Sequence, residues 1–407
     1  MERNRSDKVK KNVRLDMILF FIMSLLFFMS ISAFDPFIST FATEIGITPS
    51  VVGGIVGVAG LASLFTRLPV GVLSDMLLKR KLFIQVGLCI TIICWSIAFL
   101  FPSAATLYLG KISDGITGST WVIYNVMFAS FFGVKEAAKA VAILGIASPA
   151  GSLIGSTIGG IVANQYGYEY SFIVAVIAAF IALLLSFFVN EKQHTECKVQ
   201  YDLKILGEQL SDKAIWLIGL LATVSIMVPF GTRDTFTPLV AVALGANPYM
   251  ISWLSNTHLI LYGIATALCA PFFYKKLGIV KTGIIGALLQ GITVMFIPYA
   301  PNLITLFILQ AAAGIAFGMN FTVLTSLSIY EIPYRKQSTR MGIFQSVYAG
   351  GMFAGPVIMG VLSEFSSLHV SFFAIGITSI LCALFMKITL KKEFTVNIRS
   401  EKAIQQK

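Results

Sequence analysis

Apolar stretches of membrane-spanning length recur along almost the whole chain. A helix needs about 20 residues to cross the roughly 30 Å of hydrocarbon in a bilayer. Twelve runs of about that length occupy residues 17–37, 51–74, 83–101, 105–128, 141–162, 171–189, 214–238, 251–271, 279–298, 304–328, 341–362 and 370–390. With 57% hydrophobic and only 12% charged residues, the composition excludes a soluble protein. The predicted fold class is an all-α integral membrane protein with twelve transmembrane helices.

The two halves of the chain repeat each other. Asp35 stands eleven residues before Gly46, with Pro49 three residues further on, and the same spacing recurs 199 residues later. In the fourth span of each half, Lys111 lies opposite Gln310 at the same offset. The predicted organisation is a cytoplasmic tail (1–16), a six-helix bundle (17–189), a cytoplasmic linker (190–213), a second six-helix bundle (214–390) and a cytoplasmic tail (391–407). Two pseudo-repeats of this kind are typical of secondary transporters with a binding site near the bilayer midplane.

The basic residues predict the orientation of the chain. On the side that carries both termini lie 27 of the 30 Lys and Arg residues, and the loops of the opposite side carry none. The positive-inside rule therefore places both termini in the cytoplasm. Apposition to anionic lipid accounts for the net charge of +11, so nucleic acid is not an expected partner. The expected localisation is multi-pass in a cell membrane, taken as a bacterial inner or plasma membrane.

Charged residues inside the spans mark the candidate site, because each costs about 2.5–3.5 kcal/mol at a helix centre on insertion scales. Apart from Arg67 and Asp75, near the end of the second span, all fall in the first or fourth helix of a repeat. Together with two amides of the tenth span they predict one cavity for protons and substrate. Its residues are Asp35, Lys111, Asp114, Arg233, Asp234, Gln310 and Asn320.

Each of these charges also has a structural explanation. Asp35 and Asp234 lie about 20 residues into their segments, so solvation at the outer interface is the alternative to proton or substrate binding. Lys111 and Asp114 are three residues apart on one helical face and are expected to pair. Arg233 and Asp234 are adjacent, so they are expected to point to different faces and to need separate partners.

Two further polar residues have open roles. Arg67 either extends its side chain to the inner membrane surface or has a functional role. His258, in the eighth span, is expected to be a hydrogen-bonded structural histidine, and a proton relay is the alternative.

A short charged hinge joins the second and third spans and contains Gly71, Asp75, Lys79, Arg80 and Lys81. Small residues also recur on one face of the fifth and eleventh spans, where they let two helix backbones approach closely. This predicted helix-packing motif consists of Gly151, Gly155, Gly159, Gly160, Gly351, Gly355 and Pro356.

The hinge, the two halves and the glycine motif together resemble the major facilitator superfamily over nearly the whole chain. The resemblance implies that the hinge is a cytoplasmic gate, whose acid and bases lock the two halves in the outward-open state. Lys79 stands in place of an arginine of that motif and Leu78 in place of its second glycine. Lys111 and Gly115 occupy the places of a fourth-helix motif associated with proton transfer. The fifth-helix run is similar to the antiporter motif of drug and metabolite exporters, with Ser156 in place of its proline.

The leading hypothesis is therefore a secondary active transporter with alternating access that exports a small organic compound or drug by proton antiport. A proton-coupled importer is the alternative, and a non-transporting membrane sensor is a third possibility. The sequence has no nucleophile–base–acid set, no phosphate-binding loop and no metal-ligand spacing, so neither an enzyme nor a cofactor or metal is expected. Expected partners are the lipid bilayer, a small-molecule substrate and protons, with the protein a monomer. The cavity's three acids and two bases favour a zwitterionic or anionic substrate.

Overall fold

The computed structural model describes residues 2–77, 79–132, 136, 140, 143–191, 203–330 and 332–404 of the 407 residues. Within these ranges the side chains of residues 2–13, 68, 75, 203–206, 334, 335, 338 and 391–404 lie outside the description. Regular structure in the described part is entirely helical, and eleven helices there are long and apolar enough to cross a membrane. Helices α5 (Ala104–Ser119) and α6 (Trp121–Ala129) divide the remaining predicted span at Thr120. Within the described residues, each of the twelve predicted spans is thus mostly helical.

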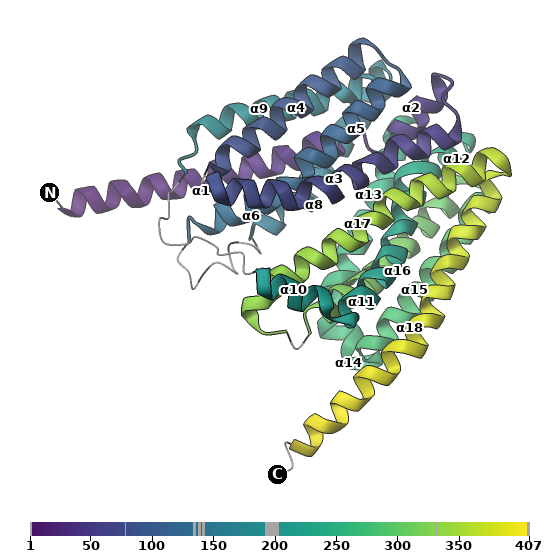
Figure 1. The fold of residues 1–407 in the computed structure, drawn as a ribbon. Coiled ribbons are helices and arrows are strands. Elements are labelled where there is room, and N and C mark those ends of the chain that lie inside the picture. Colours follow the sequence, from purple (N-terminus) through teal and green to yellow (C-terminus); the bar gives the residue numbers. More distant parts are fainter. Residues whose placement is uncertain are drawn as a thin grey trace. The chain divides into compact units, whose positions relative to one another are not determined.

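The chain forms two compact units (Figure 1). Unit 1 contains Met1–Ile47, Gly54–Tyr201 and Ala246–Trp253, and unit 2 contains Thr48–Gly53, Asp202–Gly245 and Leu254–Lys407. The division falls between residues 201 and 202, and each unit includes one short segment from the other half of the sequence. The bundle, linker and tail boundaries given above stay predictions.

Unit 1 is organised around an aromatic core. Its helices are α1 (Glu2–Ser32), α2 (Ile38–Glu44), α3 (Pro49–Leu77) from residue 54 on, α4 (Arg80–Leu100), α5, α6, α8 (Ala147–Tyr166) and α9 (Tyr170–Phe188). Helix α1 packs on α8 and α9, and α4 packs on α5 and α9 (Figure 1). Phe20 and Phe27 of α1 lie against Tyr124 of α6, with ring centroids 5.5 and 4.8 Å apart. Ser103 is the N-cap residue of α5 and forms a capping box with Thr106.

Unit 2 has an aliphatic core formed by α11, α15, α16, α17 and α18. Its elements are α10 (Leu203–Ser211), α11 (Lys213–Gly231), η2 (Thr232–Phe236), α12 (Thr237–Ala243), α13 (Pro248–Leu268) from residue 254 on, η3 (Cys269–Phe273), α14 (Tyr274–Leu277), α15 (Ile279–Phe296), η4 (Ile297–Tyr299), α16 (Leu303–Ser328), α17 (Tyr334–Phe365) and α18 (Leu368–Ile404). Helix α11 packs along α17, and α15 packs between α16 and α18.

The first helix of each repeat is interrupted at its aspartate. Helix α1 ends at Ser32 and α2 begins at Ile38, so Asp35 lies in the turn between them. Pro36 follows Asp35, and a residue before proline is disfavoured in helical conformation. At the equivalent place in unit 2, α11 passes into the π-helical turn η2, which contains Asp234. These interruptions place a carboxylate of each unit at a break in a membrane-length helix.

The same turn follows both interruptions. Gly46 and Gly245 have φ angles of 83° and 84°, a left-handed conformation that favours glycine. Helices α3 and α13 then begin at Pro49 and Pro248. The repeat predicted from residue spacing therefore corresponds to a repeated backbone motif.

Candidate functional site

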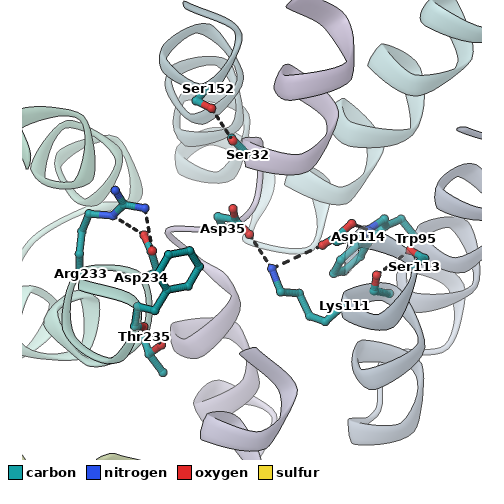
Figure 2. A network of polar contacts seen from close by, with 12 residues as sticks. Ser32, Asp35, Trp95, Lys111, Ser113, Asp114, Ser152, Arg233, Asp234 and Thr235 are labelled. Carbon is teal, nitrogen blue, oxygen red and sulfur yellow. Dashed lines mark hydrogen bonds and ion pairs between the residues drawn. The ribbon is translucent and has the colours of Figure 1, made fainter. Parts of the chain in front are cut away.

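One lysine of unit 1 lies between two carboxylates (Figure 2). Lys111, on α5, donates from Nζ to Asp35 Oδ1 at 2.7 Å, and the same Nζ lies 3.4 Å from Asp114 Oδ2. The side chains of Lys111 and Asp114 are 7% and 3% exposed, whereas that of Asp35 is 29% exposed. The predicted pairing of Lys111 with Asp114 is confirmed. Asp35 joins the two from the break between α1 and α2.

Aromatic rings hold the buried acid of this cluster. Trp95 Nε1, on α4, donates to Asp114 Oδ1 at 2.8 Å. Asp114 Oδ2 has no hydrogen-bond partner among the described residues and faces only the longer ion pair with Lys111. The ring of Phe34 packs on Trp95 with centroids 3.7 Å apart, and Lys111 Nζ lies 5.4 Å from the Phe34 centroid, within cation–π range. One oxygen of Asp114 is therefore held by Trp95, and the other is buried with Lys111 at ion-pair distance.

The cluster has one more acid than base. When both carboxylates are ionised, Lys111 neutralises only one of them. A surplus buried charge is costly in a low-dielectric interior, so the cluster favours acquiring one further positive charge.

In unit 2 the adjacent Arg233 and Asp234 pair with each other, contrary to the prediction that they need separate partners. Arg233 Nε lies 2.5 Å from Asp234 Oδ1, and a second guanidinium nitrogen donates to Oδ2 at 2.6 Å (Figure 2). Both residues lie in the π-helical turn Thr232–Phe236, where the backbone departs from the regular α-helix that the prediction assumed. The guanidinium of Arg233 and the carboxylate of Asp234 form the two parallel hydrogen bonds that are typical of an arginine–carboxylate pair.

The two amides predicted for the cavity have different surroundings. Asn320 is fully buried on α16 and donates to Ser225 Oγ at 2.9 Å and to Gln290 Oε1 at 3.2 Å. It therefore ties α16 to α11 and α15. Gln310 is also buried, but on the part of α16 that packs beside His258. Neither ring nitrogen of His258 has a hydrogen-bond partner among the described residues, although polar groups of Gln310 lie beside the ring, so the structural role expected of His258 stays a prediction.

The structure thus brings Asp35, Lys111 and Asp114 together in unit 1 and pairs Arg233 with Asp234 in unit 2. That all seven residues line one cavity stays a prediction.

A buried ion cluster at a helix break, within an array of membrane-length helices, is typical of transporters. The model of the Major Facilitator Superfamily matches residues 20–242 and 230–406. The chain belongs to the Major Facilitator Superfamily. It is accordingly a multi-pass membrane protein.

Relatives and solved structures agree with this family. The multi-drug resistance efflux pump PmrA of Streptococcus pneumoniae is 24% identical over 189 residues, which cover 46% of this chain and 45% of the pump. The chain thus matches about half the length of this curated relative. A bacterial homologue of the human lysosomal transporter Spinster, in an inward-facing and occupied conformation, has a TM-score of 0.79 at 14% identity, covering 93% of this chain and 97% of that one. The nucleoside transporter NupG has a TM-score of 0.73 at 14% identity, covering 92% and 99%. At these identities the two structures show the fold alone.

Two of the predicted gate residues have a local role in unit 1. Lys81 Nζ donates to two carbonyl oxygens at the C-terminal end of α9, each at 3.1 Å. Glu191, just beyond α9, accepts from the backbone N–H of Arg80 at 2.8 Å. These bonds join the start of α4 to the end of α9, where a cation also complements the helix dipole. The side chain of Asp75 lies outside the described part of the chain, so the gate itself stays a prediction.

The predicted close approach of helices at the glycine motif is present in both units. In unit 1, a Cβ on Gly151 or Gly155 would collide with the backbone of α1 at Leu25 or Met29. In unit 2, a Cβ on Gly355 would collide with the backbone of α11 at Met227. The small residues therefore allow α1 to pack on α8 and α11 to pack on α17 at backbone distance.

Sequence reasoning missed Trp95 and the helix breaks. Trp95 lies in an apolar run that offers no signal of a hydrogen bond to an acid on another helix. The break at Asp35 did have a signal, because proline follows it.

Proposed function

We propose that this transporter exchanges protons for a small organic compound across a cell membrane and works as an exporter. The observation that carries the proposal is the lysine shared between one buried and one more exposed carboxylate. Similarity to an efflux pump over about half its length supports export. The distribution of basic residues supports a cytoplasmic location for both termini.

The coupling follows from the charge balance of the cluster. Asp114 is the proposed proton site, because Trp95 occupies one of its oxygens and the other lacks a hydrogen bond. With a proton on Asp114, Lys111 pairs with Asp35 alone. When a substrate occupies Asp35, Lys111 turns fully to Asp114 and favours release of the proton. Proton and substrate therefore alternate, as antiport requires.

The pairing also changes the proposed substrate charge. Asp234 already neutralises Arg233, so the surplus acid of unit 1 is the charge left for a substrate. This favours a positively charged compound over the zwitterion or anion that the count of acids and bases suggested. Asp35, with 29% of its side chain exposed, is the carboxylate that such a compound would meet.

The test uses proteoliposomes with an acidic lumen and a trapped pH-sensitive dye. Addition of ethidium, a permanent organic cation, should raise the lumenal pH if the protein is an antiporter. A fall in lumenal pH would indicate a symporter, and no change would indicate that the protein does not couple ethidium to protons. Benzoate and glycine betaine serve as the anionic and zwitterionic comparisons.

Three variants test the assignment of residues. Asp114→Asn should abolish proton movement while ethidium still binds, and Asp35→Asn should weaken ethidium binding. Asp234→Asn should leave coupling intact but reduce activity, because it leaves Arg233 without this carboxylate. Glu208→Gln, at an exposed ion pair with Lys336, is the matched control. Wild-type transport by both Asp35→Asn and Asp114→Asn across the pH range would show that the proton site is wrongly assigned.

A further inference from the structure

Two neighbouring polar side chains in unit 2 carry buried nitrogen atoms that have no hydrogen-bond partner among the described residues. His258 on α13 is 2% exposed and Gln310 on α16 is 1% exposed. His258 Nδ1 and Nε2 and Gln310 Nε2 have no hydrogen-bond partner among the described residues. Gln310 lies next to the imidazole ring. Buried polar groups in native proteins almost always have a hydrogen-bond partner. We call these three nitrogen atoms the open atoms, and their position side by side indicates that a bound molecule or group supplies the missing hydrogen bonds.

The internal repeat explains why this place is open. Gln310 is the counterpart of Lys111, and His258 is the counterpart of Ala59, each 199 residues later. The packing agrees, because a Cβ on Gly115 would meet the backbone of Ala59 and a Cβ on Gly314 would meet the backbone of His258. In unit 1 the residue at this position is a cation paired with Asp35. In unit 2 an amide takes its place.

The acid of unit 2 is not available to that amide. Asp234, the counterpart of Asp35, is held by both hydrogen bonds from Arg233. Arg233 of η2 acts electrostatically on His258, and its charge is balanced by the paired Asp234. The open atoms therefore form an uncharged site beside a neutralised ion pair.

The chemistry of the open atoms defines the occupant. Gln310 Nε2 is a donor, and a neutral imidazole has one donor and one acceptor nitrogen. A small neutral group that both donates and accepts fits this set. Water, a hydroxyl and a carboxamide have this property. A buried water needs polar partners of this kind, and leaving a donor or acceptor unsatisfied costs about 1–3 kcal/mol.

An aromatic surface adjoins the site. The His258 ring lies 6.1 Å from that of Phe317, which in turn lies 5.0 Å from Tyr262 and 5.2 Å from Phe321. Tyr262 and Phe321 are partly exposed. A planar ring that carries a neutral polar group could therefore stack on Phe317, Tyr262 or Phe321 while its polar group contacts the open atoms.

We propose that His258 and Gln310 form an uncharged hydrogen-bonding subsite, which holds water in the substrate-free protein and a hydroxyl or carboxamide group of an aromatic substrate in the loaded protein. The proposal rests on transport of a small organic compound, but not on proton coupling or direction. It deepens the proposed function by naming a neutral polar group as a recognised part of the substrate.

The first test detects the water. Histidine labelled with nitrogen-15 gives few imidazole signals in the full-length protein in liposomes, because the chain has three histidines. Loss of a signal in His258→Gln assigns it, and His369, whose ring lies 5.0 Å from Tyr299, is the internal control. We expect His258 to show the shifts of a hydrogen-bonded ring and exchange of magnetisation with water. A ring that is dry and free of hydrogen bonds would overturn the proposal.

The second test uses 2-naphthamide as the probe and 2-isopropenylnaphthalene, which has the same shape without the polar atoms, as its control. The amide should shift the His258 signals, displace the water exchange and leave His369 unchanged. Its affinity should fall about tenfold in Gln310→Leu, as expected for a lost hydrogen bond with an unsatisfied partner. Gln310→Met is a second variant should the first fail to fold.

Three results would overturn the substrate assignment: no response to 2-naphthamide, the same response to both compounds, or unchanged affinity in both Gln310 variants. The assay needs no proton gradient. A transporter that lacks proton coupling would fail the lumenal-pH test and still give a clear answer here.

Discussion

Lys111→Met is the sharpest test of the buried ion cluster. The substitution keeps the length of the side chain and removes its charge, leaving two carboxylates without their cation. Asp35 is 29% exposed and can be hydrated, but Asp114 is only 3% exposed and cannot. Most of the expected loss of stability therefore comes from Asp114.

The distances set the size of the effect. At an effective dielectric constant of about 20, the attraction of Lys111 is about 6 kcal/mol for Asp35 at 2.7 Å and about 5 kcal/mol for Asp114 at 3.4 Å. Desolvation offsets much of this, and removal of one partner of a buried pair typically costs about 3–5 kcal/mol. We expect Lys111→Met to lower the free energy of unfolding by that amount. Adding Asp114→Asn should restore most of it, and adding Asp35→Asn should restore less.

Equilibrium unfolding in mixed micelles with increasing dodecyl sulfate, followed by circular dichroism, measures these differences. The difference in the free energy of unfolding between wild type and Lys111→Met should become smaller as the pH falls, because protonation neutralises carboxylates that have lost their cation. A loss of less than about 1 kcal/mol, well below the range for a broken buried pair, would refute the reasoning. Equal rescue by Asp35→Asn and Asp114→Asn would also refute it.

Three further predictions concern packing, the linker helix and the gate. Gly155→Ala should destabilise unit 1 by about 1–3 kcal/mol, because its Cβ would lie 2.8 Å from Met29 Cα. Gly263→Ala is the control and should not destabilise the protein, because a Cβ there would have open space around it. Thermal unfolding of the two variants measures the difference. Although partial burial opposes it, hydrogen bonds from the Ala214 N–H and the Arg340 guanidinium hold the pKa of Asp212 below its ordinary value. The stabilisation by Asp212 is therefore full above the ordinary pKa of about 3.9 and is lost as the pH falls through the lower folded value. The hydrogen-exchange protection factors of α10, which remove the intrinsic pH dependence of exchange, should fall in acid for wild type and lose this dependence in Asp212→Asn. Asp75→Asn should slow turnover and leave substrate affinity unchanged, and a selective loss of binding would contradict its role in the gate.

The candidate site was only partly accessible to sequence reasoning. A charge in an apolar run is conspicuous because of its cost, so Asp35, Lys111 and Asp114 stood out, and their helical spacing predicted one of the two ion pairs. The contact with Asp35 joins residues 76 positions apart and depends on the helix break beside it. Regular helical spacing failed at Arg233, where the backbone winds as a π-helix. Spacing arguments are valid only where the helix is regular.

The sequence by itself determined the membrane class, the twelve spans, the internal repeat and the glycine faces. These features depend on run length and residue spacing, which the chemistry of a bilayer and of a helix converts directly into structure. The tertiary structure decided which charges are neutralised, because hydrogen-bond partners depend on the distance between helices and on the breaks within them. It left Asp114 with one open oxygen and His258 with two open nitrogens among the described residues. The proposed proton site and the proposed neutral subsite both follow from those open atoms.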